Sequence, residues 1–156
     1  MEPRMVKYGM TEAGAWDVVR RCESGMLATV NPDGSPYVVP VNHVVVDGRI
    51  VIHGRASGQK VSNLTLDPRC CFSVADPKGY DYESDLACDT ETLFESAVVS
   101  GRARIVEDQD EKTRLLRALA DRFGRTGEIP EDRVSFTCVI EIIPESVTGK
   151  YRRPKA

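Results

Sequence analysis

Both histidines and several basic residues fall close together around a predicted β-hairpin. The dipeptide Asp47-Gly48 favours a two-residue type I′ turn between valine-rich segments. Strand alternation then places one set of facing residues on a single face. Those pairs are Val46 with Arg49, Val44 with Val51, Asn42 with His53, and Pro40 with Arg55. The end of this face far from the turn is therefore predicted to carry Asn42, His53 and Arg55 side by side.

Directly after the hairpin, the segment Ser57-Gly58-Gln59-Lys60 opens a predicted helix. A helix start attracts anions through its unpaired backbone N–H groups and its dipole, and Arg55 and Lys60 add full charges here. A phosphate fits this place, and a flat ring system can extend from it along the strand toward Asn42. Flavin mononucleotide (FMN) has that shape. The same residues are also typical of an ordinary helix cap beside a solvated lysine.

His53 is the candidate proton donor or substrate-orienting group, because an unperturbed imidazole titrates near neutral pH. The alternative is a polar side chain that only braces the sheet. Cys88 is redox-active if it is exposed near a flavin, and structural otherwise. The five cysteines are odd in number and show no C-x-x-C spacing. This predicts free, mostly buried thiols, with no disulfide and no metal site.

Hydrophobic periodicity and turn signals predict the elements that position these residues. Helices are predicted at residues 11–24, 57–66 and 108–123, and strands at 26–30, 37–46, 49–53, 69–75, 93–106 and 136–143. Residues 76–89 are predicted to form a polar loop, and Gly101 a bend in its strand. Hairpin-linked strands with two or three peripheral helices favour a mainly β fold, an antiparallel barrel decorated by helices.

The strand predicted at residues 37–46 is apolar on both faces, with the run Val44-Val45-Val46 at its end. A surface strand of a monomer would alternate more cleanly between apolar and polar residues. One face of this strand is therefore predicted to meet a second subunit.

Composition narrows the class of protein. The chain has 156 residues, of which 41% are hydrophobic and 29% charged, as expected for one soluble globular domain over residues 1–156. Its net charge of −3 predicts no general attraction to nucleic acid or to anionic membranes. No apolar run is long enough to span a membrane, and the N-terminus lacks the apolar core of a signal peptide. A cytoplasmic protein is expected.

Seven blocks of sequence, in order along the chain, resemble the pyridoxamine 5′-phosphate oxidase-like superfamily, and within it the nitroimidazole-resistance (Nim) type of flavoprotein. They are residues 25–43 (GMLATVNPDGSPYVVPVNH), 52–55 (IHGR), 58–60 (GQK), 63–70 (NLTLDPRC), 87–89 (ACD), 96–103 (SAVVSGRA) and 148–150 (TGK). The similarity spans nearly the whole chain, which makes it more specific than any single motif.

The resemblance implies an FMN-binding split β-barrel, a homodimer with two FMN molecules between its subunits. It implies Val39, Pro40, Val41 and Asn42 along the isoalloxazine ring, His53 and Gly54 beside the ribityl chain, and Gly58, Gln59 and Lys60 at the phosphate. Ser96 matches a position that contacts the flavin from the partner subunit. Gly54 stands where relatives often carry a hydroxyl, so Arg55 and Lys60 are expected to dominate phosphate recognition. Thr90 stands where relatives commonly have tryptophan, which opens the substrate side.

The resemblance also implies an FMN-dependent oxidoreductase that reduces a small electron-poor aromatic substrate such as a nitroimidazole. The chain lacks the basic strand motif of true pyridoxamine phosphate oxidases, which argues against that substrate. A second hypothesis is a flavin- or haem-binding carrier or sensor without turnover, with His43 or His53 as an axial haem ligand. A third is an F420-dependent reductase that uses the same groove.

Overall fold

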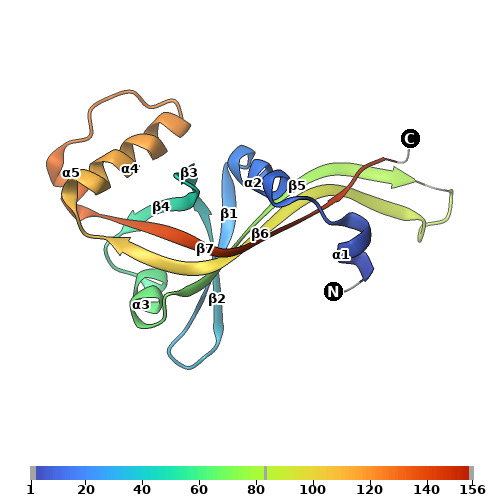
Figure 1. Cartoon of the computed structure of the whole chain (residues 1–156), viewed down its shortest axis with the longest axis horizontal. Coiled ribbons are helices and arrows are strands. Elements are labelled where there is room, and N and C mark those ends of the chain that lie inside the picture. The colour runs from blue at the N-terminus through green and yellow to red at the C-terminus, as the bar shows by residue number, and fades with distance from the viewer. Residues whose placement is uncertain (1–2, 83, 155–156) are drawn as a thin grey trace.

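The protein is described by a computed structural model that covers residues 3–82 and 84–154. Its strands are β1 (Ser24–Val30), β2 (Pro36–Asn42), β3 (Val44–Val46), β4 (Arg49–Arg55), β5 (Arg69–Tyr82), β6 (Thr90–Val106) and β7 (Thr137–Arg152), and its helices are α1 (Pro3–Tyr8), α2 (Glu12–Arg21), α3 (Gln59–Leu66), α4 (Gln109–Arg122) and α5 (Glu131–Phe136). The fold is mainly β, as predicted, with the sheet curled into a half-barrel. Figure 1 shows α3, α4 and α5 at one end of the molecule and the β5–β6 hairpin projecting from the other.

Neighbouring strands of the sheet are all antiparallel, in the order β2-β1-β5-β6-β7-β4-β3. The strands β2 and β3 are therefore at opposite edges of the sheet although one residue, His43, separates them in the chain. The sheet curls until the β2 edge comes close to β4. This near-closure is what brings residues of two distant strands to one surface.

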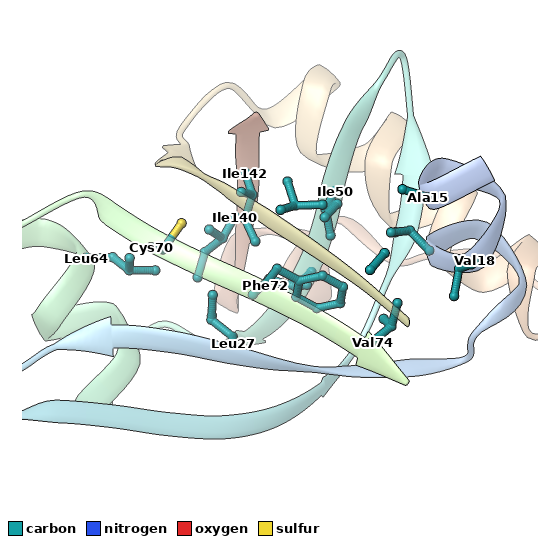
Figure 2. Close-up of a cluster of buried hydrophobic side chains, with 14 of the residues drawn as sticks. Ala15, Val18, Leu27, Ile50, Leu64, Cys70, Phe72, Val74, Ile140 and Ile142 are labelled. Atoms are coloured by element: carbon teal, nitrogen blue, oxygen red, sulfur yellow. The ribbon is translucent and has the colours of Figure 1, made fainter. Parts of the chain in front are cut away.

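The core has two parts, one inside the curl and one under α4. Figure 2 shows the inner part, where side chains from α2 and from the strands converge on Phe72. A side-chain carbon at Gly25 would lie 2.3 Å from Cζ of Phe72, so β1 packs on this ring only because residue 25 has none. The outer part joins Val51 and Val139 to the inward face of α4, which includes Leu115 and Leu119. The strands β4 and β7 separate the two parts.

Several predicted elements are confirmed at or near their predicted bounds. Thr11 caps α2 by accepting a hydrogen bond from the Gly14 amide, and Asp108 caps α4 by accepting one from the Glu111 amide. The β3–β4 turn has the expected hairpin pairs next to Asp47-Gly48. The predicted bend at Gly101 is a shift of register between β6 and β7.

Other predictions were wrong because tertiary pairing overrides local polarity. The predicted strand at residues 37–46 is two strands, β2 and β3, broken at His43. The first half of the predicted loop at 76–89 is strand: β5 continues to Tyr82 across a bulge near Pro77, and β6 begins at Thr90. The last strand also runs on to Arg152, and the short helices α1 and α5 were not predicted. In the described part of the chain, no helix has the length and apolar character needed to cross a membrane.

Candidate flavin site

A polar hollow of about 490 Å³ opens where the β2 edge approaches β4 and the start of α3. Five of the residues that line it come from these three elements, and β1 adds one. They are Pro40, Val41 and Asn42 from β2, His53 from β4, Lys60 from α3, and Ser24 from β1. The hollow thus collects five of the predicted site residues on one surface. Ser24 was not predicted, because its place beside Asn42 depends on the pairing of β1 with β2.

The route by which Asn42 and His53 meet differs from the predicted one. The hairpin register holds only from Val44 to Val46, and Asn42 pairs with Ser24 rather than with His53. Pro40 likewise pairs with Met26 and not with Arg55. Asn42 and His53 come together because the sheet curls, and not because they are rungs of one ladder.

Lys60 sits over a gap left by Gly54. A side-chain carbon built at Gly54 would lie 2.8 Å from the Lys60 Nζ atom. The half-buried lysine therefore places its ammonium group against the β4 backbone, next to His53. The absence of a side chain at residue 54 thus leaves room for the Lys60 ammonium at a position where a hydroxyl-bearing side chain would collide with it.

The start of α3 leaves its first amides without a side-chain cap. The N-cap is Gly58, which has φ +135° and no side-chain hydrogen bond to the helix. Its carbonyl accepts from the amides of Val61 and Ser62. Ser57 is therefore not the cap, and the alternative prediction of an ordinary side-chain-capped helix start was wrong. An uncapped amide end with Lys60 in its first turn suits an anion.

Asparagine and glutamine side chains fix α3 to the turn that follows β1. Gln59 Nε2 and Asn63 Nδ2 both donate to Asn31 Oδ1, each at 2.8 Å, and Asn63 also donates to Thr29 Oγ1 at 3.0 Å. The Gln59 side chain is thus engaged away from the hollow, which leaves only its backbone for a ligand. Asn31 and the buried Asn63 act as positioning residues that the sequence reasoning missed, since their partners are about thirty positions away.

His53 presents an exposed imidazole to the hollow. Partial burial of the ring, and then the nearby Lys60 ammonium, hold the His53 pKa below its ordinary value of 6.5. The ring is therefore neutral at physiological pH, with one nitrogen able to donate and one able to accept a hydrogen bond. It suits the orientation of a polar substrate group.

His43 cannot reach the hollow. Its side chain is buried, the Nε2 atom lies 2.8 Å from the Val19 carbonyl oxygen, and the ring meets Phe72 edge-on with centroids 4.8 Å apart. Burial lowers the pKa of His43. The alternative role of His43 as an axial haem ligand does not fit this fold, because the ring is buried in the core and its Nε2 atom is already bonded to the Val19 carbonyl.

The remaining predicted residues lie outside the hollow. Val39 packs its side chain on the inner core, and Arg55 is exposed one rung beyond Gly54, paired in the ladder with Thr137. Ser96 is half-buried on β6, between Ala75 and Lys150. Cys88 is exposed between β5 and β6, which excludes a buried structural thiol. Among the described residues no cluster of side chains suits a metal ion.

The fold and much of the sequence match known proteins. The family described as pyridoxamine 5′-phosphate oxidase matches residues 11–151. A candidate 5-nitroimidazole antibiotic resistance protein from Bacteroides thetaiotaomicron has a TM-score of 0.79 at 19% identity, over 91% of this chain and 85% of that one. An FAD- and haem-binding protein from Mycobacterium smegmatis has a TM-score of 0.77 at 20% identity, over 90% of this chain and 69% of that one. An FAD-binding protein from Mesorhizobium loti has a TM-score of 0.68 at 19% identity, over 93% of this chain and 97% of that one. No curated protein sequence matches.

Proposed function

The chain belongs to the pyridoxamine 5′-phosphate oxidase family, and on that basis we propose that it is a flavin-dependent oxidoreductase with FMN in the hollow. The observation that carries this proposal is the hollow's charge pattern. The α3 side contributes the Lys60 ammonium, in the first turn of a helix without a side-chain cap, and the β2 side contributes neutral Asn42 and Pro40. This polarity matches a ligand with a phosphate at one end and a flat ring at the other.

In this proposal Lys60 and the α3 amides at Gln59 and Lys60 hold the phosphate, with Gly58 letting the chain turn into the helix. Arg55 is exposed on β4 next to Gly54, and it attracts the phosphate from a longer distance than Lys60 does. His53 and Gly54 lie beside the ribityl chain. The ring extends along the backbone of Val39, Pro40, Val41 and Asn42, as the family resemblance implies.

When bound, the flavin supplies hydride transfer, and the residues of the chain position the substrate and move protons. His53 is the proposed proton donor or orienting group, since its imidazole is exposed and inside the hollow. Because the pKa of the ring is lowered, the neutral form prevails at physiological pH and orients the substrate through a hydrogen bond, while proton donation requires the imidazolium form that grows as the pH falls. The proposed substrate is a small electron-poor aromatic compound such as a nitroimidazole. The similar fold of a candidate nitroimidazole resistance protein supports this choice of substrate class.

A homodimer is proposed from an uncovered face of the sheet. Three apolar side chains on this face are exposed: Val38 at 56%, Met26 at 51% and Val98 at 38%. Met26 and Val98 flank Ser73 in neighbouring ladders, so they share one face. Ser96, two residues before Val98, lies on the same face. A second copy packed here would bury the apolar side chains and bring Ser96 to the interface.

The cofactor proposal is tested by the ligand itself. Purified protein should show flavin absorption bands, or bind added FMN stoichiometrically with quenched flavin fluorescence. A Soret band instead of flavin bands would favour the haem carrier, for which His53 is then the accessible imidazole. Failure of the wild type to bind either FMN or FAD would overturn the proposal.

The dimer proposal is tested by light scattering on the flavin-bound protein. About twice the monomer mass is expected, and Val98→Lys should reduce it toward the monomer, because the charge cannot be buried at an apolar interface. Glu107→Lys serves as the control, since Glu107 is exposed outside the strands. A stable monomer that still holds flavin would contradict the proposal.

A further inference from the structure

A second pocket adjoins the hollow, with His53 in the lining of both. This pocket has a volume of about 280 Å³ and lies between α4, the segment leading into α5, and the ends of β4 and β7. Leu116, Leu119 and Ile129 give it an apolar wall, and Phe123, which is 38% exposed, contributes an aromatic ring. The pocket is too small for a complete cofactor but has the size of one ring-and-sugar unit, because pockets for whole ligands run to roughly 300–1,000 Å³.

Two arginines in the pocket lining are free to meet an anion. Arg125 and Arg133 are exposed, and their guanidinium groups make no ion pair or hydrogen bond with any residue that the structure describes. The backbone that carries Arg125 is nevertheless held in place. Arg117 donates to the carbonyl oxygens of Arg125 and of Gly127, the latter at 2.6 Å. The arrangement is thus an apolar pocket with a fixed wall and two unpaired positive charges.

The pocket lies at the phosphate end of the proposed flavin site. Thr137 lines the pocket and pairs in the ladder with Arg55, one rung past Gly54 and the Lys60 ammonium. Asn42, at the ring end, lines the hollow but not the pocket. A ligand that fills both the hollow and the pocket therefore extends beyond its first phosphate. Its extension carries a second anionic group, which meets the arginines, and a flat apolar group, which meets the apolar wall.

We propose that this pocket binds the adenosine monophosphate half of flavin adenine dinucleotide (FAD), so that the chain prefers FAD to FMN. This inference rests on the proposed flavin site, in which the mononucleotide half of FAD takes the place given to FMN. Arg125 and Arg133 meet the second phosphate, and the adenine lies against Phe123 and the leucines of α4. Guanidinium groups suit both tasks, since they bind phosphate through paired N–H donors and stack on aromatic rings.

The experiment compares the affinities of FAD and FMN for the full chain freed of ligand, by fluorescence titration. Wild type should bind FAD about tenfold or more tightly than FMN, the effect of one charge-assisted contact. In the double variant Arg125→Ala, Arg133→Ala the ratio of the two affinities should fall toward one. Ala120→Trp, which fills the pocket from α4, should lower the same ratio without removing a charge. Arg114→Ala is the matched control, because Arg114 is on α4 but pairs with Asp47, away from the pocket.

The outcomes separate this inference from the proposed function. Equal affinities of FAD and FMN for wild type would overturn the inference while leaving the flavin site intact. A ratio that stays high in both pocket variants would also overturn it, because the adenosine would then bind elsewhere. Absence of binding of either flavin to wild type would instead reject the proposed function. Circular dichroism spectra of all variants should match that of wild type, so that a lower ratio reports binding and not unfolding.

Discussion

The two histidines of the chain lie in opposite surroundings, His43 in the core and His53 in the lining of the hollow. His43 follows Asn42 directly but turns inward at the break between β2 and β3, where it bonds to Val19 and packs on Phe72. His53 is on β4, ten positions later, and its ring is exposed among Lys60 and Asn42. The pKa of each ring is lowered mainly by burial, but only the His53 ring faces a space that a ligand can enter.

The difference teaches that the same side chain serves the fold in one place and chemistry in the other. At His43 the chain must pass from one edge of the sheet to the other within a single residue, and the buried hydrogen bond secures that passage. At His53 the strand is already fixed by its ladder with β7, so the side chain is not needed for packing. A substitution at His43 should therefore lower the stability of the fold, and a substitution at His53 should lower the rate of the reaction.

The largest effect is expected from His43→Ala, which should lower the free energy of unfolding by about 3 kcal/mol. The substitution leaves a cavity beside Phe72 and an unpaired carbonyl at Val19. His53→Ala, at an exposed position, should cost less than about 1 kcal/mol. Urea unfolding of ligand-free protein measures both, and equal losses would remove the distinction between the histidines.

His53→Ala should instead slow the reaction about a hundredfold per bound flavin, which is the usual loss when a general acid is removed. The measurement follows reoxidation of dithionite-reduced protein by a nitroaromatic acceptor in a stopped-flow instrument, so it needs no knowledge of the natural electron donor. His53→Gln keeps a hydrogen-bonding group that does not titrate, and it separates orientation from proton donation. Unchanged rates in both variants would exclude His53 from the reaction.

Lys60→Ala should weaken FMN binding about ten- to a hundredfold, or about 1.5–3 kcal/mol, through loss of a charge-assisted contact. Riboflavin has no phosphate and should bind both proteins equally well. Arg55→Ala should have a smaller effect than Lys60→Ala, because Arg55 does not line the hollow. Lys78→Ala is the control, since Lys78 pairs with Asp76 on the projecting hairpin. An FMN affinity that does not respond to Lys60 would move the phosphate site elsewhere.

The smallest expected effect is the dependence of stability on pH between 7.5 and 5.5. Burial lowers the folded-state pKa of His43 below 6.5, so the unfolded chain binds the proton more readily. The stability contributed by the neutral ring is therefore full above pH 6.5 and is lost as the pH falls through the folded-state pKa. His43→Gln should show a weaker loss on acidification than wild type in urea unfolding at the two pH values. An identical slope would show that His43 does not titrate in this range.

The sequence was sufficient to predict the fold class and most of the residues of the hollow. Local signals predicted local structure correctly: the helices that begin after Thr11 and Asp108, and the hairpin turn at Asp47-Gly48. The predicted pairing of Asn42 with His53 was wrong, because a continuous apolar run gives no sign that the chain changes sheet edge at His43. The second pocket was not predicted for a related reason. Its residues come from α4, the segment after it, α5, β4 and β7, which only the tertiary structure brings together.

The order of the strands also has a consequence for the time at which the hollow is assembled. The hairpins β1–β2 and β5–β6 join strands that are adjacent in the chain, whereas β4 is attached to the rest of the sheet through β7, with Ile50 facing Ile142. Contacts between residues so far apart in sequence form late, because a long loop must close first. During synthesis, the β2 side of the hollow can fold while the β4 side, with His53, still lacks its support. In the proposed function, flavin therefore binds only after β7 has left the ribosome and paired with β4.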